Sequence, residues 1–291
     1  MKAAVRGGVG AGLAAAVAVA IGVPVSSGVG DAKPHGCTEA WDGAGPSGSA
    51  TPATRSGFAK STEVVDNFDG PAGTAPDPDV WTVVEGTGWD GGIQNYTADN
   101  AVLDGNGNLV LRAVKADNGY NSGRVETRRK ASFGYGTLIA RIKMPGGAGL
   151  WPGFWLLGAD EDFNPWPGAG EIDVVEVVSD PHRAYSSIHG PIAGVPDYLQ
   201  QQFVNTGPDL SADFHDYWVI RAEDKITVGI DDTVWGVFTP DTLPSSAQWV
   251  YNKPFCLILN LAVGGDWAGS PDDSTAFPAT MLIDWVHWEP A

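Results

Sequence analysis

Short apolar segments, separated by turn-forming residues, run through most of the chain. Residues Asn108 to Val114 alternate between apolar and polar positions, as a strand with one buried face does. The segment from Phe255 to Val263 is almost continuously apolar, which favours a strand buried on both faces. Tyr217 to Arg221 and Ile226 to Ile230, joined by a charged turn, predict a hairpin. Many short strands with turns between them predict an all-β two-sheet sandwich or a barrel, and the pattern alone does not choose between them.

Helices have little place in this pattern. Further strands are expected within residues 132–144 and 281–288, whereas Asp197 to Val204 and the segment around Ser245 predict at most short helices. The chain contains 39 Gly and 21 Pro, which favours many turns over long helices.

The first 32 residues have the pattern of a secretory signal peptide. Lys2 and Arg6 form a short basic region, and residues 8–25 after it carry no charge. A membrane anchor is the competing interpretation, but the stretch is barely long enough. Residues 33–60 are rich in Gly, Ser, Thr, Ala and Pro, as a flexible linker is. Because no second linker or repeat follows, we expect one domain over residues 61–291, secreted to the extracellular space and free of the membrane after cleavage.

Composition narrows the possible partners. The chain has 17 Lys and Arg against 35 Asp and Glu, a formal net charge of −18. This balance disfavours nucleic acid, because phosphates would be repelled. Apolar residues make up 43% of the 291 residues, which is enough for a sizeable core. The two cysteines are Cys37 and Cys256, and the apolar surroundings of Cys256 favour a buried thiol without a bridge.

Three acids fall within one predicted strand, residues 170–178. In a regular strand Glu171, Asp173 and Val175 share one face, which would turn Glu176 toward the core. Burying an unpaired carboxylate there is costly. One extra residue, a β-bulge, returns Glu176 to the face of the other two acids. The sequence therefore predicts a bulge and three carboxylates on one surface.

Clustered carboxylates suit more than one function. Mutual repulsion should raise at least one pKa, so that one acid donates a proton while another stays ionised, as glycoside cleavage requires. A solvated acidic edge and a divalent-metal site are the alternatives. Trp151, Trp155 and Trp166 lie close by in the sequence with Pro and Gly beside them. Indole rings that stack on sugars favour the glycosidase interpretation, since a metal site would not need them.

The chain resembles a bacterial glycoside hydrolase of family 16, on the laminarinase-like (endo-β-1,3-glucanase) branch, over residues 63–289. The matching segments run in the family's order. They are Ser122-Gly-Arg-Val, Phe133-Gly-Tyr-Gly, Ala140-Arg-Ile-Lys-Met-Pro, Gly149-Leu-Trp-Pro-Gly-Phe-Trp-Leu-Leu-Gly, Gly170-Glu-Ile-Asp-Val-Val-Glu, His189-Gly-Pro, Phe214-His-Asp-Tyr, Pro254-Phe-Cys-Leu-Ile-Leu-Asn-Leu-Ala-Val-Gly-Gly and Ile283-Asp-Trp-Val.

The resemblance implies an antiparallel two-sheet β-jelly-roll with a substrate cleft on its concave face, and a retaining mechanism. Glu171 matches the nucleophile, Glu176 the general acid/base, and Asp173 the acid between them that tunes the pair. The two residues between Asp173 and Glu176 match the bulged variant that the family associates with laminarinases. No cofactor is implied for catalysis.

The resemblance also implies residues that contact sugar. Four tryptophans match aromatic positions in or beside the cleft, three charged residues lie where the family binds hydroxyl groups, and a histidine and an asparagine match positions near the acids. For the charged residues, surface ion pairs are the alternative; for the histidine it is a buried, hydrogen-bonded core residue. In this chain they are Trp151, Trp155, Trp166, Trp267, Arg124, Glu126, Arg128, His189 and Asn260.

Many members of the family hold a structural calcium ion on the convex side. Its ligands would be the backbone carbonyls of Asn67 and Gly107 and the carboxylate of Asp284, and hard oxygen ligands suit calcium. Asp284 in a final apolar strand would otherwise be an awkward charge.

One departure from the family concerns substrate choice. After Trp89 the chain reads Asp90-Gly-Gly-Ile-Gln-Asn, one residue shorter than many laminarinase-like members and without their Glu. The negative charge disfavours sulfated or carboxylated polymers, so a neutral β-1,3-glucan or mixed-linkage glucan is the expected polysaccharide. An endo-β-galactanase, a wall-remodelling transglycosylase and a non-catalytic carbohydrate-binding jelly roll are the alternatives. We expect a monomer.

Overall fold

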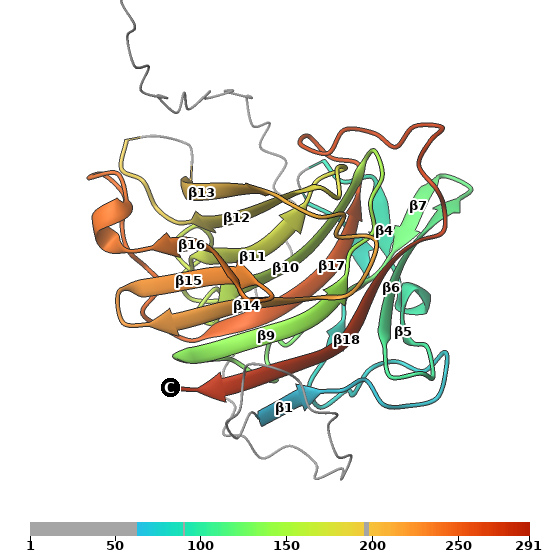
Figure 1. Cartoon of the computed structure of the whole chain (residues 1–291), viewed down its shortest axis with the longest axis horizontal. Coiled ribbons are helices and arrows are strands. Elements are labelled where there is room, and N and C mark those ends of the chain that lie inside the picture. Colours follow the sequence, from blue (N-terminus) through green and yellow to red (C-terminus); the bar gives the residue numbers. More distant parts are fainter. Residues whose placement is uncertain (1–62, 90, 195–197) are drawn as a thin grey trace, which may run out of the picture. The chain divides into compact units, whose positions relative to one another are not determined.

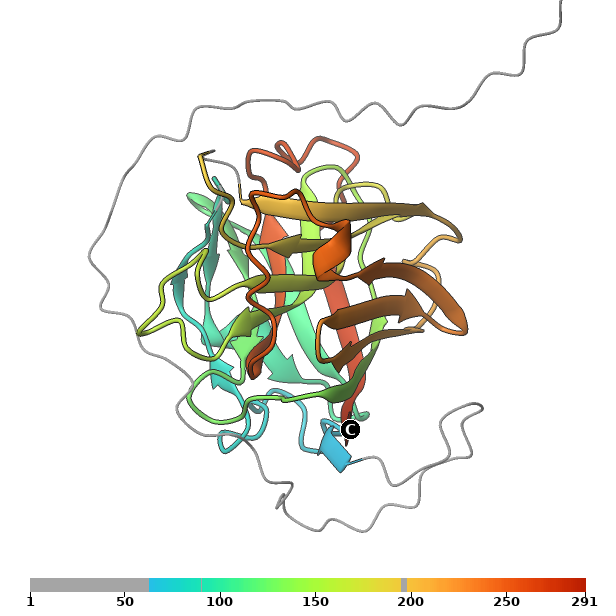
Figure 2. The same cartoon turned by 90° about the vertical axis from the view of Figure 1, so that its left-hand side faces the viewer.

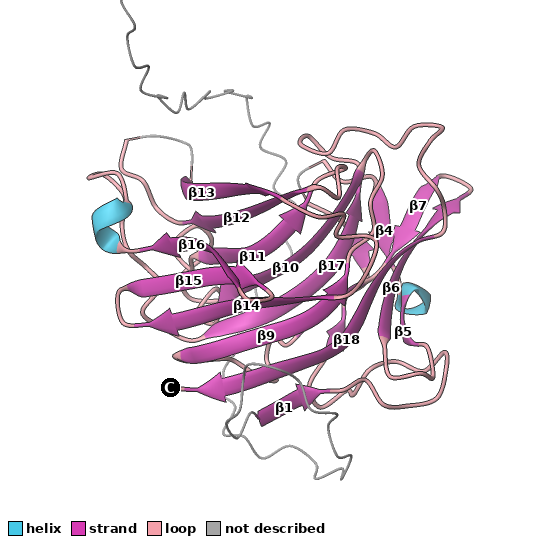
Figure 3. Cartoon of the chain, viewed as in Figure 1, coloured by secondary structure: helices cyan, strands magenta, loops and turns pink. Residues whose placement is uncertain are grey.

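Two β-sheets account for nearly all of the secondary structure. The structure, a computed structural model, describes residues 63–89, 91–194 and 198–291. Within these residues the only helical elements are the two 3₁₀ turns η1 (Ala98–Asn100) and η2 (Pro240–Thr242), and Figure 3 shows strands joined by loops elsewhere. No helix of the described residues is long and apolar enough to cross a membrane. The predicted signal peptide and linker lie outside the described residues.

The seven-stranded sheet has the order β13-β12-β11-β10-β17-β8-β2. All of its pairings are antiparallel. Its strands are β2 (Thr82–Val83), β8 (Arg124–Glu126), β10 (Leu150–Gly158), β11 (Glu171–Val177), β12 (Arg183–His189), β13 (Leu199–Thr206) and β17 (Phe255–Val263).

The eleven-stranded sheet has the order β16-β15-β14-β9-β18-β6-β7-β4-β3, with β1 paired to β18 and β5 to β6. Only the pairing of β4 with β7 is parallel. Its strands are β1 (Glu63–Asp66), β3 (Gly86–Thr87), β4 (Gln94–Tyr96), β5 (Ala101–Leu103), β6 (Leu109–Ala116), β7 (Gly119–Ser122), β9 (Gly136–Lys143), β14 (His215–Ala222), β15 (Lys225–Ile230), β16 (Thr233–Phe238) and β18 (Ala279–Pro290).

The core lies between the two sheets, which Figures 1 and 2 show layered against each other. On β10, Phe154 and Leu156 are fully buried, whereas the intervening Trp155 is half-buried on the opposite face. On β17, Leu257, Leu259 and Leu261 all belong to the same apolar cluster. The alternation of side chains along a strand thus assigns one face of each sheet to the core and frees the other for function.

Most of the predicted strands are confirmed, including the hairpin of β14 and β15 and the doubly buried β17. The expectation of a short helix over residues 197–204 was wrong, because Leu199–Thr206 form β13, paired to β12. The expectation of an unbridged Cys256 was also wrong, because this buried cysteine is disulfide-bonded. Cys37 lies outside the described residues.

Candidate active site

A β-bulge in β11 places the three acids on one face. Asp173 lies opposite Ser187 of β12 and Glu176 opposite Tyr185, so two residues of β11 face a single residue of β12. The register with β10 shifts at the same place. The extra residue lies in the pair Val174-Val175, both of which are buried in the core. The predicted bulge is confirmed, and it turns Glu176 to the side of Glu171 and Asp173. We call this side of the seven-stranded sheet the acid face.

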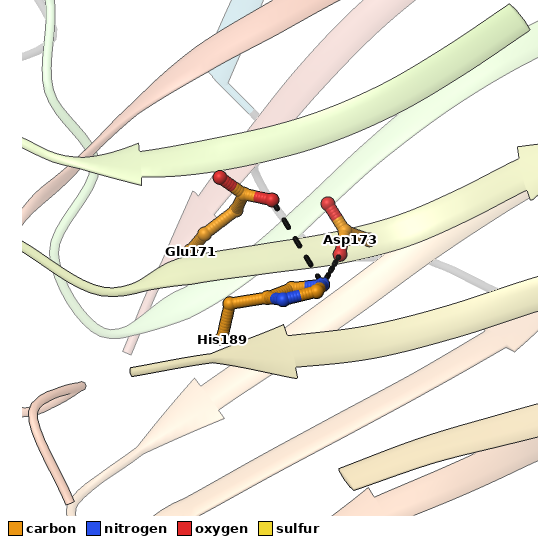
Figure 4. Close-up of side chains that lie close together, drawn as sticks. All are labelled: Glu171, Asp173 and His189. Atoms are coloured by element: carbon orange, nitrogen blue, oxygen red, sulfur yellow. Dashed lines mark ion pairs between the residues drawn. The ribbon is translucent and has the colours of Figure 1, made fainter. Parts of the chain in front are cut away.

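His189 on β12 joins two of the acids. Its Nε2 lies 3.1 Å from Asp173 Oδ2 and 4.0 Å from Glu171 Oε1. Figure 4 shows Glu171 and Asp173 projecting from the same side of their strand, with the imidazole of His189 turned toward both. Asp173 is the most buried of the three, since only 4% of its side chain is exposed, against 21% for Glu171 and 23% for His189. The predicted place of His189 beside the acids is confirmed.

The donor atoms of Glu171, Asp173 and His189 all lie within 4.8 Å of one another. That spacing alone would allow a metal ion. Calcium, however, takes six to eight oxygen ligands, and an imidazole nitrogen is not one of them. Calcium is therefore a poor fit here, and the imidazole instead makes a close contact with Asp173.

Beneath the acids a buried tyrosine stays neutral. Burial, and then the negative charges of Asp173 and Glu171, raise the pKa of Tyr251 above its ordinary value. Its hydroxyl donates a hydrogen bond of 2.7 Å to Gln200 Oε1. The Tyr251 hydroxyl therefore keeps its proton and serves as a hydrogen-bond donor in this buried position.

Glu176 lies among aromatic rings. The indole N–H of Trp151 on β10 donates a hydrogen bond of 2.7 Å to Glu176 Oε1. Trp267 stands edge-on to Trp151, with ring centres 5.2 Å apart. Trp267 also packs against Tyr185, the residue opposite Glu176, with ring centres 4.6 Å apart. Two of the predicted aromatic residues, Trp151 and Trp267, thus meet directly at one of the acids.

A glycine opens space across from Glu176. Gly153 pairs with Glu176 on one side and with Asn260 of β17 on the other. The Trp155 N–H donates to Asn260 Oδ1 at 2.7 Å, and the Asn260 amide donates to the Tyr96 hydroxyl at 3.2 Å. A Cβ at position 153 would come within 3.3 Å of both Asn260 Oδ1 and the Trp155 ring. The absence of a side chain at Gly153 therefore leaves open space between the indole rings of Trp151 and Trp155 on β10.

Arg124 and Glu126 reach the same face from β8. They form an ion pair of 3.2 Å, and Arg124 is buried. The guanidinium lies 4.3 Å from the ring centre of Trp89 and 5.0 Å from that of Trp155. Its Nε has no hydrogen-bond partner among the described residues. Arg124 is therefore a buried cation that packs against two indoles, and its unpaired Nε is covered by protein rather than open to a sugar.

The two remaining residues predicted to contact sugar, Trp166 and Arg128, differ in their surroundings. Trp166 is 42% exposed and stands edge-on to Tyr198, with ring centres 4.8 Å apart. Arg128 forms ion pairs with Glu161 and Asp162, which was the alternative interpretation for this residue. Sequence reasoning missed Tyr96, Tyr185 and the Trp89–Arg124 contact. Their only signal was strand alternation, which cannot show what faces a residue across a sheet.

The three residues predicted to bind calcium meet along one edge of β18. β6 pairs with residues 279–283 of β18 and β1 with residues 286–288 of the same edge, so Asp284 lies in the gap between them. Asn67 directly follows β1 and Gly107 precedes β6. A Cβ on Gly107 would lie 3.9 Å from the Asn67 carbonyl oxygen. The donors are oxygens of the kind that calcium takes, and Asp284 already has a partner in Arg141 at 3.3 Å.

Taken together, the fold and the acid face define a carbohydrate-active β-sandwich, in which carboxylates lie on a sheet among indole rings. Residues 90–287 match the family described as Glycosyl hydrolases family 16. The chain belongs to this family, and it is a glycosidase by membership.

Individual relatives agree with this assignment. The chain is 33% identical over 228 residues to a beta-glucanase of Rhodothermus marinus, covering 73% of this chain and 79% of the relative. It is 30% identical to the glucan endo-1,3-beta-glucosidase A1 of Niallia circulans over 72% of its length, which spans only 33% of that longer relative. Among solved structures, the laminarinase catalytic domain of Thermotoga maritima superposes with a TM-score of 0.71 at 32% identity, covering 80% of this chain and 99% of that one.

Proposed function

We propose that the protein is an endo-acting, retaining β-glucanase that hydrolyses β-1,3-glucan, including mixed β-1,3/1,4 chains. The observation that carries this proposal is the bulge at Val174-Val175, which puts Glu171, Asp173 and Glu176 on one face. The relatives named above as beta-glucanase, glucan endo-1,3-beta-glucosidase and laminarinase support the substrate class. The net charge of −18 supports a neutral glucan over a sulfated one.

The proposed chemistry has two steps. In the first, Glu176 gives its proton to the glycosidic oxygen while the Glu171 carboxylate bonds to the anomeric carbon, so that the leaving sugar departs as an alcohol. In the second, Glu176 takes a proton from a water molecule, which attacks the same carbon and releases Glu171. Asp173, held by His189 at 3.1 Å, keeps the two carboxyl groups oriented.

Product analysis tests this proposal. The purified protein is incubated with laminarin, lichenan, curdlan and a β-1,3-galactan, with Glu171→Ala as the control. Short oligosaccharides from laminarin or lichenan, absent in the control, would support an endo-glucanase. Cleavage of galactan alone would leave the mechanism standing and contradict the substrate. Binding of a polymer without cleavage would favour the non-catalytic alternative, and products longer than the substrate would favour a transglycosylase.

We also propose that the protein is exported. The basic residues Lys2 and Arg6 before the uncharged residues 8–25 support a cleaved signal peptide. The disulfide at Cys256 supports an oxidising compartment, since such bonds are rare in the cytosol. N-terminal sequencing of protein recovered from culture medium would test both points, and an intact residue 1 would contradict cleavage. We also expect a monomer, and light scattering of the purified protein would test this.

A structural calcium ion is the second part of the proposal. The carbonyls of Asn67 and Gly107 and the carboxylate of Asp284 supply oxygen donors where β1 ends and β6 begins. Excess chelator should lower the melting temperature, and calcium should restore it, because an ion that binds only the folded state stabilises it. An unchanged melting curve in chelator would show that the Arg141–Asp284 ion pair satisfies this place without a metal.

A further inference from the structure

Trp151 approaches Glu176 in a way that distinguishes the two oxygens of its carboxyl group. The indole N–H donates to Oε1 at 2.7 Å. Trp151 lies two residues from Gly153, the direct partner of Glu176, so the indole reaches the carboxyl group diagonally across the sheet. Where Gly153 carries no side chain, nothing on β10 stands between the two.

The Trp151 indole packs against a second ring, which packs in turn against a third. Trp267 stands at 88° to it, and Tyr185 packs on Trp267 at 65°. Tyr185 lies directly opposite Glu176 on β12. The three rings therefore form a chain of contacts from β10, through the segment that follows β17, to the residue opposite Glu176 on β12. Such edge-on pairs stabilise a fixed geometry, which keeps the N–H aimed at Oε1.

A protonated carboxyl group has one hydroxyl oxygen and one carbonyl oxygen, and the carbonyl oxygen is the better acceptor. A donor fixed on Oε1 therefore favours the proton on the other oxygen, Oε2. We propose that Trp151 is a positioning residue for the general acid: it selects the oxygen of Glu176 that carries the proton and aims that oxygen at the glycosidic bond. This proposal rests on the acid/base role of Glu176 proposed above.

The same hydrogen bond acts in the second step. When Glu176 is ionised, the N–H stabilises the carboxylate that must accept a proton from water. The titratable groups that share this environment are Glu171 and Asp173 on β11 and His189 and Tyr185 on β12. β10 carries no titratable side chain at all. The N–H of Trp151 is thus the contribution of β10 to the charge balance of Glu176.

The test is Trp151→Phe, which keeps an aromatic ring and removes the N–H. Two substrates are compared: laminarin, whose sugar leaving group needs a proton, and 2,4-dinitrophenyl β-laminaribioside, whose phenolate leaves without one. The kcat/KM on laminarin should fall roughly 10–100-fold, the worth of a hydrogen bond to a charged group, while the value on the aryl glycoside changes little. The alkaline limb of the laminarin pH profile should move to higher pH.

Trp155→Phe is the matched control. It removes an equivalent N–H from the same strand, but that N–H binds Asn260 rather than an acid. It should lower kcat/KM on both substrates by the same factor and leave the pH profile in place. Equal losses on the two substrates in Trp151→Phe, or no loss on laminarin, would overturn the proposal.

A second variant covers the case in which Trp151→Phe does not fold. Trp267→Leu removes the edge-on ring and leaves the N–H, and it should produce the same selective loss in smaller measure. If the wild-type protein cuts galactan rather than glucan, the same comparison is made with galactan and the dinitrophenyl galactoside, so the substrate can fail while the role of Trp151 stands. A wild-type protein that cleaves none of these substrates overturns both proposals.

Discussion

The two outer faces of the sandwich hold acidic side chains in different ways. On the eleven-stranded sheet, Arg141 pairs with Asp216 at 2.8 Å and with Asp284 at 3.3 Å. On the acid face, Asp173 faces His189 instead, and Glu176 accepts a hydrogen bond from a neutral indole. An arginine is always charged and holds its partners ionised, whereas histidine and indole leave room for a proton to come and go.

The number of carboxylates in the chain therefore says little about its function. The charge of −18 is spread over many carboxylates, most of them on the surface. What marks Asp173 and Glu176 is the kind of partner: an imidazole and an indole ring contact them, whereas the arginine on the same face, Arg124, pairs with Glu126. A glycosidase needs one carboxyl group that can be protonated beside one that is ionised, and an arginine paired directly with the acid would oppose its protonation.

The largest expected effect separates the two faces directly. Glu176→Gln should lower turnover of laminarin by about 10²–10⁴-fold, the usual worth of general acid–base catalysis, with an unchanged fold. Asp216→Asn, on the other face, should leave turnover close to wild type. Rates of reducing-end release and circular dichroism would check both. Near-normal turnover of Glu176→Gln would rule out the acid/base assignment.

The next effect concerns His189. His189→Ala removes the imidazole that lies 3.1 Å from Asp173, and we expect kcat/KM to fall roughly 10–100-fold, as for the loss of a close polar contact to a charged group. His189→Gln keeps an N–H donor at a similar reach and should recover part of the loss. Equal activity of the two variants would mean that an N–H donor beside Asp173 does not contribute to turnover.

Arg141→Met should change stability rather than catalysis. The side chains of Arg141, Asp216 and Asp284 are each about one third exposed. Solvent screens such pairs, so we expect the free energy of unfolding to fall by only about 0–1 kcal/mol. Urea unfolding measures the loss, and laminarin assays of the folded variant should match wild type. A large drop in activity would show that the two faces are coupled.

The smallest effect concerns an acid held by N–H donors alone. Burial opposes the shift, but hydrogen bonds from Asn106 and Asn108 outweigh it and lower the pKa of Asp104 below 3.8. A lowered pKa contributes stability above the unfolded value, and this contribution is lost as pH falls through the folded value. Asp104→Asn should therefore lower the melting temperature slightly at pH 7 and not at pH 2. Equal shifts at both values would mean that the charge plays no part.

The acid face could be predicted from the sequence because burying a charged side chain in the core costs so much free energy. Glu176 could not point into the core, so a bulge at Val174-Val175 followed from the cost of burying a charge. Strand β17 could also be predicted, because an almost continuous apolar run is typical of a strand that is buried on both faces. The wrong prediction for β13 has the opposite cause. Leu199–Thr206 is an edge strand rich in polar residues, and its pairing with β12 decides its structure.

Contacts between side chains that are far apart in the sequence could not be predicted for a similar reason. Arg128 lies two residues from Glu126 in the sequence, yet it pairs with Glu161 and Asp162 on a distant loop. Tyr185 meets Trp267 only because the strand register and a long connection bring them together. The Cys256 disulfide is another such case, since two cysteines in a sequence do not say whether they meet.

The place of β18 in the sheet also affects how the protein is made. This strand lies between β9 and β6, near the middle of the eleven-stranded sheet, and it also pairs with β1 from the other end of the described chain. Until residues 279–290 have been synthesised, β6 and β9 have no common neighbour. The eleven-stranded sheet therefore cannot be completed before the end of this strand is made.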